Sequence, residues 1–265
     1  MKLIKMDRYK MDRYLSSAPW RELAEDYRMR LGGPPAGCVR TIALSELQDE
    51  AACREYVSWL KDYIGAPDMQ VAASMLAKRI GYLWIAPILT AMTFHHREVF
   101  FPLDRSFLYH PASAQDTTFP FLALDGIRSA SPPGDRGEWR EAVVKENFAV
   151  RLAPILETLA TVGPVSMAVL WENIMVRIAP LYAPGTDESG EERLRIQEDF
   201  AYLTRMAAGP LFSARRNPFT RFTEGSDEAP VAKSKRITCC FYYRMSGEYC
   251  RKCPKIDNEN ESQLK

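Results

Sequence analysis

Four cysteines lie close together near the end of the chain, where their types and spacing could support metal chemistry. Cys239 and Cys240 are adjacent, and Cys250 and Cys253 are separated by two residues. A thiolate is a good ligand for zinc and for iron, and four thiolates complete either a tetrahedral zinc site or a [2Fe-2S] cluster. Neighbouring side chains in a strand point to opposite sides, so Cys239 and Cys240 reach one metal centre only if the backbone bends. On spacing alone, zinc and iron–sulfur are equally good interpretations.

The residues around the cysteines indicate a fold-back and a strong local charge. Ser246-Gly247 is a turn signal, which predicts a short hairpin that returns Cys250 toward Cys240. Residues 233–255 contain seven basic residues and one acidic residue, so they have a net charge of +6, and the rest of the chain sums to −5 because the whole chain is +1. Such a field favours an anionic metal centre, an anionic substrate or an acidic electron donor. A solvated basic surface is the simpler alternative.

The elements that must position these cysteines are mainly helical. Ser45 with Gln48 predicts a capped helix over 46–64, and Asp68 predicts the cap of a second helix that continues into an apolar run. Short aromatic-rich segments between 98 and 125 predict strands of a small antiparallel sheet. Further helices are predicted over 138–160, 166–182 and 191–208. The expected fold class is α+β, predominantly helical, with a small antiparallel sheet and a C-terminal cysteine-bearing hairpin.

The order of these predicted elements along the sequence divides the chain into three parts. These are an N-terminal extension over 1–40, a mainly helical α+β domain over 41–222, and a C-terminal cysteine segment over 231–257. The net charge of +1 argues against nucleic-acid binding. The longest uncharged run, 80–94, has 15 residues, fewer than the roughly 20 of a membrane span, and Pro87 interrupts it. No secretory signal is visible, so a reducing cytoplasm is expected, where disulfides are uncommon.

Several other residues that attract attention have structural interpretations. Cys53 lies in a predicted helix and is expected to be a small buried hydrophobe. Trp84 and Trp171 have apolar neighbours and are expected in the core, and His110 is expected to be structural. His95-His96 follows the apolar run and is expected at a helix end or in a loop.

The cysteine spacing resembles a known family signature. The FhuF-type ferric siderophore reductases end in Cys-Cys-x₁₀-Cys-x₂-Cys, and here nine residues separate Cys240 from Cys250. The stretch MLAKRIGYLWIAPILTAMTF is similar to a family segment with a basic pair and an apolar run. VLWENIMVRIAP is similar to the family's Leu-Trp-x-Asn helix, with Glu172 where glycine is common, and Asn217-Pro218-Phe219 falls where such proteins often have Asn-Pro. The resemblance covers roughly residues 40–255.

This resemblance implies a function. It implies that Cys239, Cys240, Cys250 and Cys253 hold a [2Fe-2S] cluster, with no catalytic side chain beyond these ligands. The cluster would give one electron to Fe(III) in a siderophore and release Fe(II), in the cytoplasm or peripherally at the inner face of the membrane. The sequence has no G-x-G-x-x-G motif, so electrons are expected from a separate donor such as a ferredoxin or a flavodoxin-like protein.

The basic residues that flank the cysteines are the candidate substrate residues, because a guanidinium donates hydrogen bonds in a fork that suits chelate oxygens. These candidates are Arg215, Arg216, Arg236, Arg244, Arg251 and Lys252. The alternative function is a binding or scaffold protein of siderophore metabolism with a structural zinc site, since the C-terminal part of aerobactin-type siderophore synthetases resembles these reductases. A simple electron carrier is a third interpretation.

Overall fold

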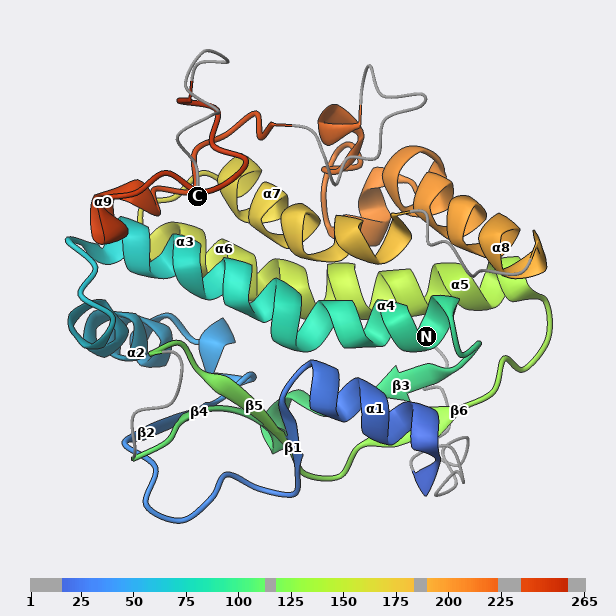
Figure 1. Cartoon of the computed structure of the whole chain (residues 1–265), viewed down its shortest axis with the longest axis horizontal. Helices are drawn as coiled ribbons and strands as arrows, with labels where there is room; N and C mark the ends of the chain where they lie inside the picture. The colour runs from blue at the N-terminus through green and yellow to red at the C-terminus, as the bar shows by residue number, and fades with distance from the viewer. Residues whose placement is uncertain (1–15, 113–117, 184–189, 224–234, 257–265) are drawn as a thin grey trace.

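The computed structural model of the chain describes residues 16–112, 118–183, 190–223 and 235–256 (Figure 1). Helices dominate these residues, which agrees with the predicted α+β class. In chain order the α-helices are α1 (Ala18–Asp26), α2 (Glu50–Tyr63), α3 (Met69–Ile80), α4 (Ala86–Thr93), α5 (Arg136–Lys145), α6 (Ala153–Val162), α7 (Met167–Ile178), α8 (Gly190–Ala201) and α9 (Tyr243–Ser246). Shorter helical turns, labelled η, connect or extend several of them.

Two long helical runs form the centre of the molecule. In the first, α3 continues through the π-helical turn η4 (Gly81–Ile85) into α4, and in the second, α5 continues through η6 (Glu146–Leu152) into α6. Both runs resume as Ala-Pro-Ile-Leu, with Pro87 and Pro154 in the first turn after the π-helical segment. A proline inside a helix removes one hydrogen-bond donor and crowds the preceding turn. The wider π-helical turn accommodates that change, so each run continues past its proline.

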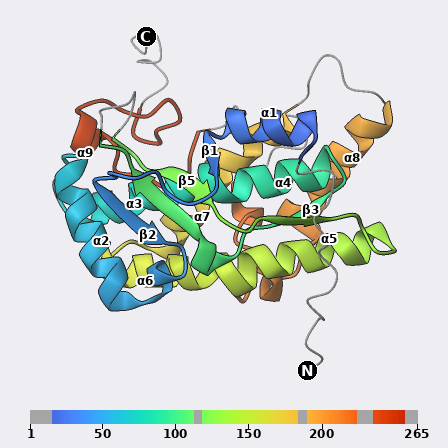
Figure 2. The same cartoon turned by 90° about the horizontal axis from the view of Figure 1, so that it is seen from below.

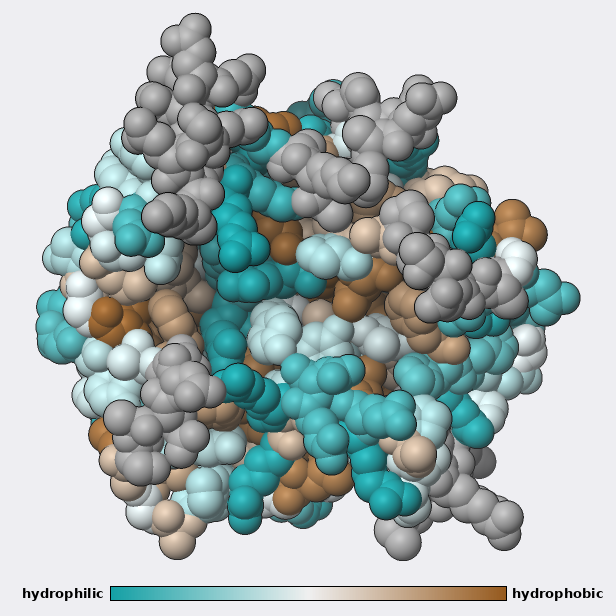
Figure 3. Space-filling model, viewed as in Figure 1, coloured by the Kyte–Doolittle hydropathy of each residue, from teal (hydrophilic) through white to brown (hydrophobic). Residues whose placement is uncertain are grey.

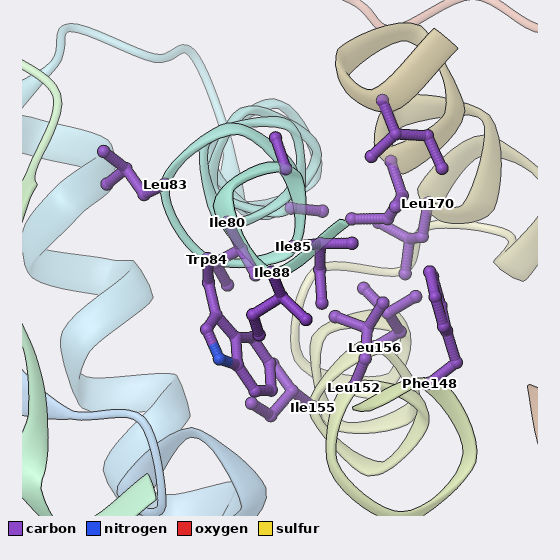
Figure 4. Close-up of a cluster of buried hydrophobic side chains, with 14 of the residues drawn as sticks. Ile80, Leu83, Trp84, Ile85, Ile88, Phe148, Leu152, Ile155, Leu156 and Leu170 are labelled. Carbon is purple, nitrogen blue, oxygen red and sulfur yellow. The ribbon is translucent and has the colours of Figure 1, made fainter. Parts of the chain in front are cut away.

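The two runs pack against each other through a continuous apolar core (Figure 4). Trp84 and Ile88 of the first run face Ile155 and Leu156 of the second, and all four are buried. The predicted apolar run 80–94 is therefore a core helix. In the parts of the chain that the structure describes, no helix is both long enough and apolar enough to cross a membrane.

A small mixed sheet covers one face of these helices (Figures 1 and 2). Its order is β1-β5-β4-β2, and β4 pairs antiparallel with both β5 and β2, so Leu108 lies opposite Leu122 on one side and Ile42 on the other. A separate antiparallel pair joins β3 to β6. The strands are β1 (Met29–Leu31), β2 (Arg40–Ala43), β3 (Glu98–Phe100), β4 (Ser106–His110), β5 (Phe121–Leu124) and β6 (Arg128–Ala130).

The predicted N-terminal extension differs from the structure over its described part. Residues 1–15 lie outside the described residues, but from residue 16 onward the chain belongs to the folded body. Trp20 of α1 is fully buried in the core. β1 pairs with β5 in parallel, which makes the sheet mixed where the sequence predicted an antiparallel one. A strand of three residues is too short for an alternation of apolar and polar side chains to be recognised in the sequence.

The helix starts follow capping chemistry, with one correction. Asp68 caps α3 by accepting from the N–H of Val71, and Ser166 caps α7, as predicted. The predicted start at Ser45 is wrong: its side chain makes no capping bond, and the chain forms the short 3₁₀ turn η3 (Glu46–Gln48) there. The cap of α2 is Asp49, which accepts from the N–H of Ala52 at 2.8 Å.

Candidate metal centre

The cysteine segment lies across the ends of α3 and α7, on the face of the helices opposite the sheet (Figure 1). Its described residues, 235–256, contain no strand, so the predicted hairpin is a loop and not a β-hairpin. The segment still folds back, because the N–H of Arg236 donates to the carbonyl of Lys252 at 2.9 Å. The one-turn helix α9 forms its tip and ends at Gly247, whose φ of 76° permits the left-handed turn.

A sharp bend follows the adjacent cysteine pair. Phe241 has a φ of 65°, a left-handed conformation that is uncommon for a residue with a side chain. Its N–H points back to the sulfur of Cys239, at 3.4 Å. The backbone bend that two adjacent cysteines need in order to act together is therefore present directly after Cys240.

Of the four sulfurs, those of Cys240 and Cys250 form a close pair, and Cys239 and Cys253 are their neighbours along the chain. Cys240 and Cys253 are almost fully buried, while Cys239 and Cys250 are half-buried, and all four are free of disulfides. The sulfurs of Cys240 and Cys250 are 3.7 Å apart and hydrogen-bonded, and the N–H of Cys253 donates to the carbonyl of Cys250 at 2.8 Å. Across the described residues, no three Cys, His, Asp or Glu side chains are already arranged around a common point for a metal ion.

Positive charge surrounds the close pair. The hydrogen bond with Cys250 lowers the pKa of Cys240 to about 5, and the charges of Lys78 and Arg236 act in the same direction against the opposing effect of burial. The same hydrogen bond raises the pKa of Cys250, which keeps its proton. Burial raises the pKa of Cys239. One thiolate beside one thiol is the expected charge state of the close pair.

Glu172 attaches the start of the segment to α7. Its buried carboxylate accepts from the main-chain N–H groups of Ile237 and Thr238 at 2.7 and 2.8 Å, and from the hydroxyl of Thr238. Arg236 lies 3.4 Å from the same carboxylate and donates to the carbonyl of Thr238 at 3.1 Å. The one acidic residue in the apolar helix α7 therefore positions the main chain immediately before Cys239.

Ser74 of α3 attaches the next part of the segment. Its hydroxyl donates to the carbonyl of Cys240 at 2.9 Å, and the amide of Asn173 donates to both the hydroxyl and the carbonyl of Ser74, each at 2.9 Å. On the outer side of the segment, Arg244 pairs with Asp68 at 2.5 Å. Main-chain and side-chain bonds from both helices therefore hold Cys240 in place.

Arg236 has an unusual environment for a buried cation. The residue is 5% exposed, and both terminal nitrogens of its guanidinium, Nη1 and Nη2, lack a hydrogen-bond partner. A buried donor without an acceptor is costly, more so when it is charged. These nitrogens lie close enough to Cys240 for the charge of Arg236 to lower its pKa. An anionic group bound to the cysteines would supply the acceptors that this guanidinium lacks.

The six predicted substrate residues lie in different environments. Arg236, within the segment, is buried, and Arg244 is held by Asp68, so neither is free to contact a ligand at the surface. Arg251 is exposed and Lys252 is half-buried, both within the cysteine segment. Arg215 and Arg216 are exposed and follow η9 (Gly209–Phe212), which lies toward α8 and away from α9 in Figure 1. The structure does not bring the six together.

The residues given structural interpretations lie where expected. Cys53, Trp84 and Trp171 are buried in the core. His110 is buried, and its Nε2 is 2.9 Å from the hydroxyl of Tyr56. His95 and His96 follow the end of α4.

Sequence reasoning missed the residues of α3 and α7 that contact or surround the cysteines. In the sequence, Glu172 and Asn173 stand out only as part of a helix pattern, and Lys78 only as part of a basic pair. A carboxylate within an apolar helix was the available signal, since a buried charge needs a partner. The partner could not be identified because it lies 65 residues away along the chain.

No protein-family model matches the chain, and no curated protein is similar enough to match it.

Proposed function

We propose that the chain is a ferric siderophore reductase, which transfers one electron to chelated Fe(III) and releases Fe(II). A [2Fe-2S] cluster held by Cys239, Cys240, Cys250 and Cys253 would be the resident cofactor, and a separate ferredoxin or flavodoxin-like protein would supply the electrons. The support is the resemblance in the cysteine spacing together with the surroundings of the cysteines.

The observation that carries the proposal is the close sulfur pair beside a buried guanidinium with two unpartnered nitrogens. Two ligands of one tetrahedral metal with bonds of about 2.3 Å are separated by about 3.8 Å. The sulfurs of Cys240 and Cys250 are 3.7 Å apart, which suits two ligands of one iron. The terminal nitrogens of Arg236 are buried without a hydrogen-bond partner, and its charge acts on Cys240, which suits an anionic centre. The donor set of four sulfurs fits a [2Fe-2S] cluster.

The side chains around the cysteines have distinct tasks in this proposal. When bound, a [2Fe-2S] cluster accepts and donates single electrons. Glu172 and Ser74 position the ligand-bearing main chain, and Lys78 and Arg236 favour the negative charge of the thiolates. Cys239 and Cys250 are half-buried, so a centre that they held would be near the surface, within reach of a chelate and a donor protein. Fe(II) binds hard oxygen chelators more weakly than Fe(III), so one electron is enough to release the metal.

Anaerobic purification followed by metal and sulfide analysis tests the proposal. We expect iron and acid-labile sulfide in equal amounts, and a coloured protein whose visible absorption bleaches on reduction and returns when a ferric siderophore is added. The reduced protein should give the electron paramagnetic resonance signal of a [2Fe-2S] centre. A colourless protein with stoichiometric zinc would rule the proposal out.

The alternative is a binding or scaffold protein of siderophore metabolism with a structural zinc. The sulfur separation of 3.7 Å suits a tetrahedral zinc as well, and the many bonds from α3 and α7 to the cysteine segment suit a structural site. The same analysis separates the two, because zinc gives neither colour nor acid-labile sulfide. Binding of a ferric siderophore without its reduction would then support the alternative.

A further inference from the structure

A cluster of cations lies where α3 and α7 cross, beside the cysteine segment. Lys78 and Arg79 are in the last turn of α3, and Arg177 is in the last turn of α7. The crossing is close because Gly81 has no side chain: a Cβ there would be 3.2 Å from Ile174 and 3.4 Å from the Cβ of Arg177. The three cations are near enough that the charge of Arg177 lowers the pKa of both Lys78 and Arg79, in addition to the larger effect of burial.

These cations lack the acidic partners that several other arginines have. Arg136 and Arg140 both pair with the buried Asp199, and Arg244 pairs with Asp68. Within the described parts of the chain, no carboxylate pairs with Lys78, Arg79 or Arg177, and one terminal nitrogen of Arg79 is buried without a hydrogen-bond partner. Like charges held together without counter-charge repel one another, so an anion that binds among them is favoured.

Arg177 is the exposed member of the cation cluster. Its side chain is exposed, yet the protein around it shields it enough to lower its pKa. Figure 3 shows hydrophilic side chains gathered on the face of the molecule that is viewed in Figure 1. Arg177 is thus accessible to a ligand, in contrast to the buried Arg236.

The cations lie between the sulfurs and an aromatic hollow. The charges of Lys78 and Arg177 both interact with that of Cys240. On the other side, the guanidinium groups of Arg79 and Arg177 lie 5.4 and 5.9 Å from the ring centre of Tyr82. Tyr82 lines a hollow of about 490 Å³ together with Tyr27 and Phe94, and the rings of Tyr27 and Tyr82 are 5.2 Å apart.

Acidic residues lie in or near the walls of the hollow. Asp26 also lines it, and the charges of Glu22 and Glu192 act on His95 in its wall. The anionic part of a ligand is therefore favoured against the guanidinium groups of Arg79 and Arg177, outside the hollow that Asp26 lines. A hollow of this size suits a small molecule, and its aromatic walls suit a ligand with flat organic arms.

We infer that Arg177, Arg79, Lys78 and Tyr82 form the docking site for a negatively charged iron chelate. This inference rests on the proposed function and specifies its substrate class: anionic chelates, such as those with catecholate or carboxylate arms, are preferred over neutral ones. It also places the docking site on α3 and α7, away from Arg215 and Arg216. Because Lys78 and Arg177 are near enough for their charges to interact with that of Cys240, a ligand held by them would have its iron on the side of the cysteine segment.

Gallium(III) complexes test the docking site without any reduction, because gallium(III) has the charge and size of iron(III) but is not reduced. We would measure binding of a triply negative gallium tris-catecholate and of a neutral gallium tris-hydroxamate to the full chain by titration calorimetry. The tris-catecholate should bind more tightly, with an affinity that falls as salt is raised. Arg177→Gln should weaken it about tenfold, which is the size expected for one charged hydrogen bond.

A matched control is Arg193→Gln, which removes the same charge from the exposed face of α8. It should leave the affinity unchanged, as should Arg215→Gln. Three outcomes would overturn the inference. They are equal affinity for both gallium complexes, no binding of either complex, and unchanged binding in the double variant Arg177→Gln with Arg79→Gln. These outcomes are independent of the metal analysis: a zinc-containing chain that still binds the tris-catecholate through Arg177 retains the docking site and loses only the reductase function.

Discussion

The carboxylate of Glu172 on α7 accepts hydrogen bonds from both the main-chain N–H and the hydroxyl of Thr238, the residue immediately before Cys239. Sixty-six residues separate the two along the chain. Glu172 is 3% exposed, and a buried carboxylate is stable only where donors surround it. This pair therefore makes the position of the cysteine segment depend on the core helix.

Replacing Glu172 by glutamine should loosen the cysteine segment. The amide has one acceptor oxygen in place of two and no charge to balance Arg236, so we expect a loss of about 2 kcal/mol in the free energy of unfolding. Hydrogen exchange should rise in residues 235–250 before it rises in α6. Glu157→Gln, an exposed position on α6, is the control and should change neither quantity. Equal exchange in both variants would show that Glu172 does not hold the segment.

Replacing any of the four cysteines of the C-terminal segment should lower the metal content of the protein, whereas replacing Cys38 should not. Single serine replacements of Cys239, Cys240, Cys250 or Cys253 are each expected to lower bound iron and acid-labile sulfide strongly, because each removes one thiolate ligand. Cys38→Ser should leave the metal content unchanged, since that thiol lies in a loop and bonds to the carbonyl of Pro35. Full iron content in all four single variants would contradict the proposed ligand set.

Acid should destabilise the protein through His110. Burial lowers the pKa of His110 from 6.5 to about 4, with a smaller opposing effect from its hydrogen bond to Thr118. The unfolded chain therefore binds a proton between pH 6.5 and 4 that the folded chain does not, and stability is full above pH 6.5 and is lost as pH falls toward 4. Between pH 7 and 5 the loss from this group is about 2 kcal/mol.

Denaturant unfolding at pH 7 and pH 5 measures this loss. His110→Gln should show a smaller difference in unfolding free energy between the two pH values than the parent protein, whatever its stability at pH 7. His95 and His96 also have lowered pKa values, so part of the pH dependence should remain in the variant. An unchanged pH difference in the variant would mean that His110 is not the responsible group.

The start of α2 offers a test of the capping correction. Asp49→Ala should cost about 1 kcal/mol of stability, because its carboxylate accepts from the N–H of Ala52. Ser45→Ala should cost much less, since the Ser45 side chain makes no capping bond. Thermal or denaturant unfolding of both variants gives the comparison. The reverse order would restore Ser45 as the cap.

Local chemistry in the sequence was sufficient to predict most of the helices. Asp68 and Ser166 are followed by long apolar patterns, and such caps act within three residues, so nearby sequence decides them. At Ser45 two candidate caps lie four residues apart, and the choice of Asp49 depends on the 3₁₀ turn between them. The π-helical turns before Pro87 and Pro154 were not predicted, because they depend on how each helix packs on both sides of its proline.

The sequence by itself also determined which thiols could act together, because the spacing of Cys239, Cys240, Cys250 and Cys253 is a property of the chain alone. Only the tertiary structure decided what surrounds them. Glu172, Ser74 and Arg177 come from helices far away in the sequence, and no local pattern pairs a buried carboxylate or a cluster of cations with a distant loop. Charge and hydrogen bonding act through space, so the field around Cys240 exists only once α3, α7 and the C-terminal segment have packed together.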